Sequence, residues 1–267
     1  MKILIIGGGN MGKTFVESFV ANHTVLPENL YILEHYEEKA NQFRESGFAH
    51  SFTEPGEYIR EMDLIILAIK PQDREALYPT IVPFISAEQL VLTIMAGVTI
   101  KSLKEVLPTS RILRAMPNLP AQIGMGMSGF TADPSVSKEG LIAVQNLLNT
   151  TGKSIYFEEE AKLDAVTAIS GSGPAYVYYF MDAMIHTAQE MGFTQPQAEL
   201  LVEQTFMGAV HLLNLNTLSC RDWIGKVSSR GGTTEAAVES FKQSHLEEAI
   251  GEGLKKAHER AIALGGG

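Results

Sequence analysis

The first half of the chain alternates short apolar runs with glycines, prolines and helix-favouring segments. Its first run, Ile3–Ile6, is followed at once by three glycines, after which apolar residues recur at helical spacing. Uninterrupted apolar runs of this length are typical of strands buried on both faces of a parallel sheet. Further runs of the same kind cover Leu30–Leu33, Asp63–Ile69, Leu90–Met95 and Arg111–Met116.

Helix-favouring segments lie between these runs, over residues 37–46, 72–82 and 99–106, and Gly47 is placed to cap the first of them. Strands that alternate with helices predict an α/β domain built on a Rossmann-like, doubly wound parallel sheet. We expect this domain to occupy residues 1–160.

The pattern changes near residue 160, and no strand pattern follows Lys162. Helical periodicity or continuous apolar content instead predicts helices over residues 174–191, 195–214 and 235–264. Pro174 suits the opening turn of the first of these helices, and Gly265–Gly267 is expected to form a frayed tail. The sequence therefore predicts an all-α domain over residues 161–267.

A G-x-G-x-x-G pattern lies at the first strand-to-helix turn, where Asn10 and Met11 stand between its last two glycines. Glycines allow the tight turn, the approach of a pyrophosphate and the close packing of helix on strand. The free N–H groups of the helix start also favour phosphates. Glycine turns occur in loops without a ligand as well, but this context predicts a dinucleotide site. The expected contacts are Gly7, Gly9, Asn10, Met11 and Gly12.

Three other strands end in loops that contain small residues and prolines. Ligands of open parallel sheets bind beyond the carboxyl ends of the strands, where small residues leave room for a cofactor. Glycine and proline also simply end strands, but several such loops at one edge favour a cofactor cleft. The further candidate contacts are Ala68, Lys70, Pro71, Ala96, Gly97 and Asn118.

Glu34 lies at the end of the second apolar run, 22 residues after Gly12. An acidic residue at this place accepts hydrogen bonds from the adenosine ribose and repels a 2′-phosphate. Glu34 therefore favours NADH over NADPH. The alternative is a solvated glutamate in a charged loop.

The helical half contains two stretches rich in glycine and hydroxyl residues, Ser170–Pro174 and Ser228–Thr234. The second precedes a predicted helix, and successive N–H groups at a helix start form a nest for an anion. A small carboxylate substrate would fit there, against Gly231, Gly232, Thr233 and Thr234. The alternative is ordinary capping of the helix by threonine.

Composition narrows the chemistry. A net charge of −10 argues against nucleic acid or an anionic membrane as partner. The single cysteine, Cys220, excludes an internal disulfide framework and a cysteine-cluster metal site, and no histidine has ligand spacing, so no metal is expected. No signal core or membrane-length apolar stretch is present, which predicts a soluble cytoplasmic protein. If the protein is an enzyme, we expect the cofactor to supply the reactive group and the protein to orient it.

The chain resembles the Δ1-pyrroline-5-carboxylate reductase family over essentially its whole length. Six stretches carry the resemblance in this order: Gly7–Gly12, Ala68–Pro71, Ala96–Thr99, Arg114–Pro120, Ser170–Tyr176 and Ser228–Thr234. The resemblance implies that a hydride passes from NAD(P)H to the C=N bond of 1-pyrroline-5-carboxylate and gives L-proline. It also implies a helical dimerisation domain, an interlocked homodimer that often assembles into a decamer, and an active site between two subunits.

The resemblance further implies roles for single residues. Backbone N–H groups around Gly232, Thr233 and Thr234 would hold the substrate carboxylate, the Thr234 hydroxyl would bond the ring nitrogen, and Glu160 would lie beside the substrate. The chain departs from the family pattern at Arg230, which replaces a proline, at Lys226, which replaces an asparagine near the cofactor, and at Pro55. Reduction of another cyclic imino acid and a non-catalytic, dinucleotide-sensing dimer remain alternatives.

Overall fold

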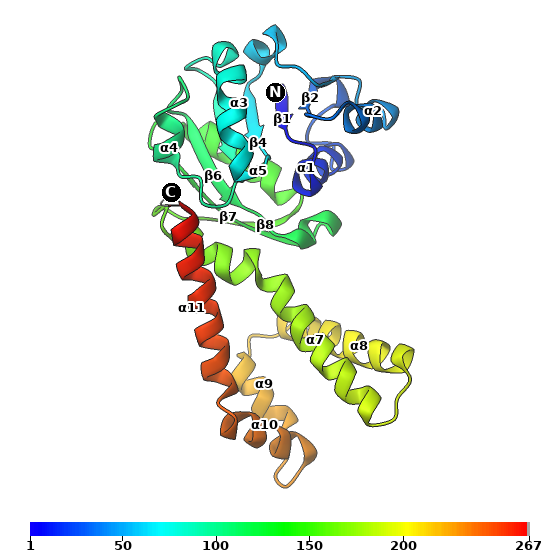
Figure 1. Cartoon of the computed structure of the whole chain (residues 1–267). Helices are drawn as coiled ribbons and strands as arrows, with labels where there is room; N and C mark the ends of the chain where they lie inside the picture. The colour runs from blue at the N-terminus through cyan, green and yellow to red at the C-terminus, as the bar shows by residue number, and fades with distance from the viewer. Residues whose placement is uncertain (266–267) are drawn as a thin grey trace. The chain divides into compact units, whose positions relative to one another are not determined.

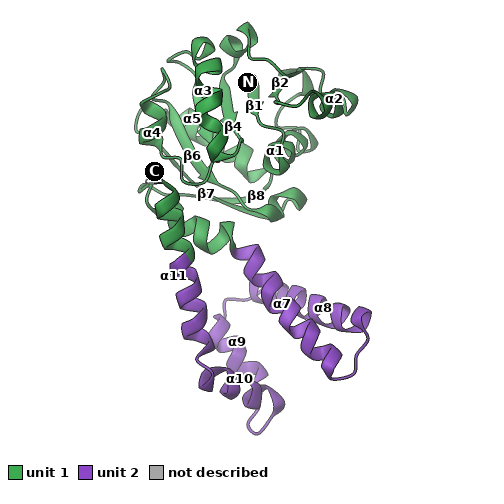
Figure 2. Cartoon of the chain, viewed as in Figure 1, with its two compact units in different colours: residues 1–172, 257–267 green, residues 173–256 purple. Residues whose placement is uncertain are grey.

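The computed structural model describes residues 1–265. The chain divides into two compact units, which Figure 2 distinguishes by colour. The first unit contains Met1–Ser172 together with the end of the chain from Ala257 onward, and the second contains Gly173–Lys256. The division predicted between residues 160 and 161 stays a prediction.

An eight-stranded sheet forms the centre of the first unit (Figure 1) in the order β3-β2-β1-β4-β5-β6-β7-β8. The strands are β1 (Ile3–Ile6), β2 (Leu30–Leu33), β3 (Ser51–Phe52), β4 (Leu64–Leu67), β5 (Leu90–Thr93), β6 (Ile112–Met116), β7 (Gly126–Ala132) and β8 (Gly152–Tyr156).

β1 to β6 run parallel, with Ile3 opposite both Leu30 on β2 and Leu64 on β4. β7 is antiparallel to β6, and β8 is parallel to β7. The carboxyl ends of β1, β4, β5 and β6 therefore share one edge of the sheet, while β7 and β8 end at the opposite edge.

Helices cover both faces of this sheet. They are α1 (Asn10–Ala21), α2 (Glu37–Glu45), α3 (Arg74–Ile81), α4 (Ile100–Lys104), α5 (Lys138–Asn149) and α6 (Lys162–Val166), with a π-helical turn η6 (Thr167–Gly171). Short 3₁₀ turns are η1 (Pro27–Asn29), η2 (Glu57–Glu61), η3 (Pro71–Asp73), η4 (Val82–Phe84) and η5 (Leu119–Ile123).

Alternate residues of the parallel strands β1, β2, β4 and β5 belong to two separate cores. Ile3 and Ile5 pack with Phe15 of α1 and the apolar face of α5, whereas Leu4 and Ile6 pack with residues of α3 and α4. A strand that is apolar at every position is thereby buried on both faces, as the sequence predicts. Each fully buried Ile, Leu or Phe side chain contributes about 1.5–3 kcal/mol to folding, so these two cores stabilise the edge that carries the loops.

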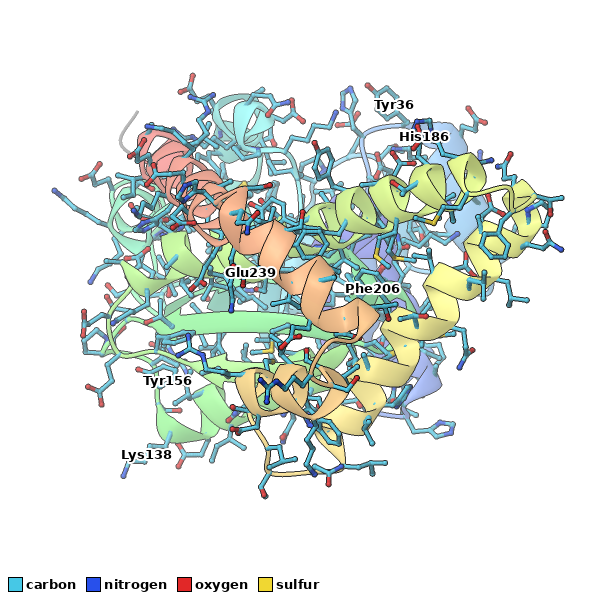
Figure 3. The ribbon with its side chains drawn as sticks, turned by 90° about the horizontal axis from the view of Figure 1, so that it is seen from below. Tyr36, Lys138, Tyr156, His186, Phe206 and Glu239 are labelled. Carbon is cyan, nitrogen blue, oxygen red and sulfur yellow. The ribbon has the colours of Figure 1, made fainter. Side chains whose placement is uncertain are left out.

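The second unit is helical, with α7 (Gly173–Glu190), α8 (Gln195–Asn214), α9 (Cys220–Val227), α10 (Thr233–Gln243) and the first part of α11 (Leu246–Gly265). Capping boxes start α8 at Thr194 and α9 at Ser219. α7 and α8 pack against each other. Figure 3 labels His186 on α7 and Phe206 on α8. Within residues 173–256, all of which are described, only Ala198 and Val202 are buried.

The predicted fold class is confirmed, as is the absence of strands after Lys162 within the described residues. One continuous helix over residues 235–264 is wrong, because the chain breaks at Ser244–His245, where His245 has φ 53°. Gly265 ends α11 rather than starting a tail, and the other two glycines of that prediction lie outside the described residues. The strands and α-helices not predicted are β3, β7, β8, α5, α6 and α9.

None of the helices between residues 1 and 265 is long and apolar enough to cross a membrane.

Candidate cofactor and substrate site

The glycine turn joins β1 to α1, and each of its glycines is explained by a different structural feature. Gly7 has φ 103°, a conformation that side chains disfavour. A Cβ on Gly12 would lie 1.9 Å from the Gly7 carbonyl oxygen, so the helix approaches the strand only without a side chain. A Cβ on Gly9, the N-cap of α1, would meet no described atom within 4 Å. Gly9 is therefore the open position at the start of the helix, where a pyrophosphate has room.

Glu34 follows β2, and its side chain turns back to this glycine turn. Its Oε2 accepts a hydrogen bond from the Gly8 N–H at 2.5 Å, and its Oε1 accepts one from the Tyr36 N–H at 3.4 Å. The residue is 5% exposed, so the alternative of a solvated loop glutamate is wrong. The next two residues are exposed, including Tyr36, which Figure 3 labels. A buried carboxylate thus borders the turn on the ribose side that the dinucleotide fold predicts.

The loop after β4 lies against the same turn. A Cβ on Gly7 would meet the Ala68 carbonyl oxygen at 2.8 Å, which leaves space only for glycine. Pro71 opens η3, and Lys70 before it is exposed. Gly7, Gly12 and Ala68 are therefore in mutual proximity, as the sequence predicts for contacts with one ligand.

The loop after β5 contains Ala96 and Gly97. Gly97 has φ 75°, and a Cβ there would lie 2.6 Å from the carbonyl oxygen of Leu264 at the end of α11. The close approach explains why the loop carries glycine. Because β5 is parallel to β4, this loop emerges at the same edge as the glycine turn.

Asn118 follows β6 at that edge, but its side-chain amide has partners within the first unit. Its Nδ2 donates to the Ser170 carbonyl at 3.0 Å, and its Oδ1 accepts from the Met127 N–H at 2.8 Å. These bonds fix the Pro117–Pro120 loop against η6 and β7. A contact between Asn118 and the cofactor stays a prediction.

An aromatic group borders the loop that contains Pro55. The rings of Phe52 and Tyr58 stack with centroids 4.1 Å apart, and Tyr31 stacks with both. Burial raises the pKa of the Tyr58 hydroxyl far above its ordinary value, and the nearby Glu54 carboxylate raises it further. Tyr58 is therefore a neutral phenol at physiological pH, and its hydroxyl donates to the Glu54 carbonyl at 3.0 Å.

Glu160 is engaged by two groups of the first unit. Its Oε1 accepts a hydrogen bond from the Ile100 N–H at 2.9 Å and pairs with Nη1 of Arg114 at 3.1 Å. Nη2 of Arg114 pairs with Asp164 at 2.9 Å. Sequence reasoning missed Arg114 and Asp164, although a charge inside an apolar strand is a signal that could have found the first. A substrate contact of Glu160 stays a prediction.

The Ser228–Thr234 loop joins α9 to α10 in the second unit. Gly231 has φ 72°, and its N–H donates to the Glu235 carboxylate at 2.6 Å. Gly232, not a threonine, is the N-cap of α10, so the alternative of ordinary threonine capping is wrong. Thr233 and Thr234 open the helix, where N–H groups lack partners within the helix. The bond to Glu235 shows that one N–H of this loop already binds a carboxylate.

Comparison with known proteins identifies the family of the chain. Residues 2–97 match the family model described as NADP oxidoreductase, coenzyme F420-dependent, and residues 160–264 match the model of pyrroline-5-carboxylate reductase dimerisation. Pyrroline-5-carboxylate reductase 2 of Bacillus subtilis (strain 168) is 34% identical over 265 residues, covering 98% of this chain and 95% of the relative.

The chain belongs to the pyrroline-5-carboxylate reductase family. The reductase of Pseudomonas aeruginosa is 32% identical, over 98% of this chain and 96% of its own length. Among solved structures, the reductase of Coxiella burnetii has a TM-score of 0.86 at 30% identity, covering 98% of both chains. That of Plasmodium falciparum with NADP bound has a TM-score of 0.88 at 25% identity, covering 99% of this chain and 98% of its own.

Proposed function

We propose that this chain reduces the C=N bond of 1-pyrroline-5-carboxylate with NAD(P)H and so produces L-proline. It is an NAD(P)H-dependent oxidoreductase of the family to which it belongs. The observation that carries the proposal is the full-length match to reductases combined with an intact Gly231–Thr234 loop at the start of α10. A protein that only sensed dinucleotides would have no need of such a carboxylate nest.

The residues present fit a dinucleotide. Gly9 leaves the start of α1 open, the first N–H groups of the helix lack partners within it, and Gly7 and Gly12 hold the turn close to the sheet. Two further loops complete the proposed cofactor edge. The loop after β4 contributes Lys70 and Pro71, and the loop after β5 contributes Ala96 and Gly97.

NADH is the proposed preferred cofactor. The carboxylate of Glu34 is buried and is tethered by the N–H groups of Gly8 and Tyr36. Hydroxyl groups of an adenosine ribose can donate to such a carboxylate, whereas a 2′-phosphate would meet its charge at short range. Lys226 is the cation that could oppose this preference, since it stands where relatives carry asparagine near the cofactor.

The substrate is proposed to bind the second unit's loop. Backbone N–H groups of Thr233 and Thr234 would hold its carboxylate at the positive end of α10. The Gly232 N–H donates to the Ser229 carbonyl at 2.9 Å and would have to leave that bond to join them. The Thr234 hydroxyl would bond the ring nitrogen and hold it during the change in its charge and geometry. Arg230, in place of the usual proline, adds a cation one position before the glycines.

Positioning dominates the proposed mechanism. When bound, NAD(P)H supplies the hydride that reaches the C=N carbon. The chain's own residues hold the carboxylate and the ring nitrogen in a fixed orientation, and no strong general acid is needed if the imine arrives protonated. Alignment of reacting groups can lower a barrier by about 7–11 kcal/mol.

The chain carries the family's dimerisation domain and forms a homo-oligomer. We propose an interlocked dimer, with the active site between two subunits, that assembles further into a decamer. The exposed apolar side chains of α7 and α8 support this assembly, since one helical pair leaves large side chains such as Tyr179 and Leu200 uncovered. We further propose that the protein acts in the cytoplasm.

Steady-state kinetics with 1-pyrroline-5-carboxylate and each cofactor test the function. The expected result is saturable NAD(P)H oxidation that forms one proline per cofactor consumed. The six-membered imine homologue serves as the comparison substrate. A higher kcat/KM for the six-membered ring would assign the chain to another cyclic imino acid, and cofactor binding without turnover of either imine would support a sensing role instead.

A further inference from the structure

A charged side chain is buried in the middle of the sheet of the first unit. Arg114 lies on β6 with its side chain 4% exposed, between Glu160 and Asp164, whose side chains are 28% and 18% exposed. The two ends of its guanidinium fork bond the two carboxylates separately, at 3.1 and 2.9 Å. A buried guanidinium is costly unless its charge is paired and its N–H groups are bonded. The two carboxylates therefore keep Arg114 in a single orientation, and Arg114 keeps them in theirs.

Glu160 transmits this orientation to a short helix. The oxygen that pairs with Arg114 also accepts the N–H of Ile100, the first residue of α4. α4 has only five residues, so its own hydrogen bonds are too few to hold it in place. The first turn of α4 therefore depends on its cap, Thr99, and on the external carboxylate of Glu160.

The start of α4 in turn limits the loop before it. Ala96–Thr99 connects the carboxyl end of β5 to Ile100, and Val98 within it is buried. Gly97 meets the backbone of Leu264 on its other side. Because both ends of this loop are fixed, a displacement of Ile100 would move the backbone of Ala96 and Gly97.

We propose that Arg114 is a positioning residue for the cofactor. It fixes Glu160, Glu160 fixes the first turn of α4, and α4 fixes the Ala96–Thr99 loop at the cofactor edge. The inference rests on the proposed function, which places NAD(P)H against this loop. A lysine would not replace Arg114, because a single ammonium lacks the planar fork that bonds two carboxylates at once.

Ile100→Pro tests the proposal by removing one N–H group. Proline is favoured at the first position of a helix, and Thr99 already has the extended ψ of 155° that a following proline requires. Ile100→Val keeps the N–H and serves as the matched control. Relative to that control, the Kd for NADH from fluorescence titration should rise about fivefold or more, because a hydrogen bond to a charged group is lost. The melting temperatures of the two variants should stay close.

A second pair of variants protects the test against a general loss of stability. Glu160→Ala removes the bond to Ile100 and also the pairing with Arg114, so it should raise the Kd for NADH at least as much as Ile100→Pro. The double variant should raise the Kd no further than Glu160→Ala alone, since the bond to Ile100 is already lost in that variant. Glu160→Gln keeps an oxygen for Ile100 but loses the charge that holds Arg114. Its Kd for NADH should therefore lie between that of the wild type and that of Glu160→Ala.

Three results would overturn the proposal. They are an equal Kd for NADH in Ile100→Pro and Ile100→Val, a lower melting temperature with an unchanged Kd, and additive effects in the double variant. The titration needs no substrate. A wild-type protein that binds NADH but reduces no pyrroline-5-carboxylate would refute the proposed function and leave this test intact.

Discussion

The carboxylate of Glu34 and the N–H of Gly8 are joined by a 2.5 Å hydrogen bond, although 26 positions separate them in the chain. The bond ties the end of β2 to the glycine turn after β1. A Cβ on Gly8 would also lie 2.7 Å from this carboxylate, so the two residues are in close contact. A carboxylate tethered in this way is held at the turn, which supports the proposed preference for NADH.

Glu34→Ser should lower the ratio of kcat/KM for NADH to that for NADPH by about tenfold or more, since a hydrogen bond to a charged group contributes about 1.5–3 kcal/mol. Glu34→Gln, which can still accept from Gly8, separates the effect of charge from that of the tether. Glu38→Ser on α2 removes an exposed charge nearby and should leave the ratio unchanged. A wild-type preference for NADPH would reject the assignment and direct attention to Lys226.

Two glycines of the turn should respond differently to alanine. Gly12→Ala places a Cβ 1.9 Å from the Gly7 oxygen and should lower both the melting temperature and the affinity for NADH. Gly9→Ala meets no described atom within 4 Å at an ordinary φ of −67°, so folding should be unaffected. Its methyl group would face the pyrophosphate, and the Kd for NADH should rise about tenfold if that contact contributes about 1.4 kcal/mol. Calorimetry measures the melting temperature of both variants, and NADH titration measures their Kd. An unchanged Kd in Gly9→Ala would show that the cofactor does not bind at this turn.

Thr234→Ala should lower kcat/KM for pyrroline-5-carboxylate by roughly tenfold to a hundredfold, which corresponds to a lost hydrogen bond of about 1.5–3 kcal/mol. Thr233→Ala removes the neighbouring hydroxyl and should have a smaller effect. Gly232→Val should be worse than either, because its Cβ would lie 3.0 Å from the Ser229 carbonyl oxygen and the side chain would block the nest. Full activity in Thr234→Ala with a collapsed affinity for NADH would assign the loop to the cofactor.

The wild-type protein should be a dimer or larger at micromolar concentration by light scattering. Leu200 on α8 is 66% exposed in the single chain, and Leu200→Glu should shift the population towards monomer and abolish activity. Gln204→Glu adds the same charge to the same helix at another exposed position and is the matched control. An active wild-type monomer would refute the shared active site.

The strands that the sequence revealed are those buried on both faces, because continuous apolar runs are a local signal. β7 contains two glycines and a serine, and β8 contributes Lys153 and other exposed residues at the edge of the sheet, so neither shows that signal. The pairing of β7 with β6 and of β8 with β7 is a tertiary event that local pattern does not encode. The break between α10 and α11 also has no local sequence signal, since no glycine or proline lies at His245.

The candidate site was predictable to the extent that it depends on backbone conformation. The positive φ values of Gly7, Gly97 and Gly231 account for glycine at three predicted positions. Partners that come from distant elements were not predictable. Neither the bond from Asn118 to Ser170 nor the pairing of Arg114 with Glu160 follows from spacing, because the partners lie 52 and 46 positions apart.

The contact between Gly97 and Leu264 has a consequence for synthesis of the protein. The ribosome releases Gly97 early, but the turn of α11 that packs on it follows the whole second unit in the chain. A contact between such distant segments carries a high cost of loop closure and forms late. In a nascent chain that contains all the strands, the loop after β5 should therefore not yet have its final conformation. The chain should bind the cofactor with full affinity only after α11 has been synthesised and has packed.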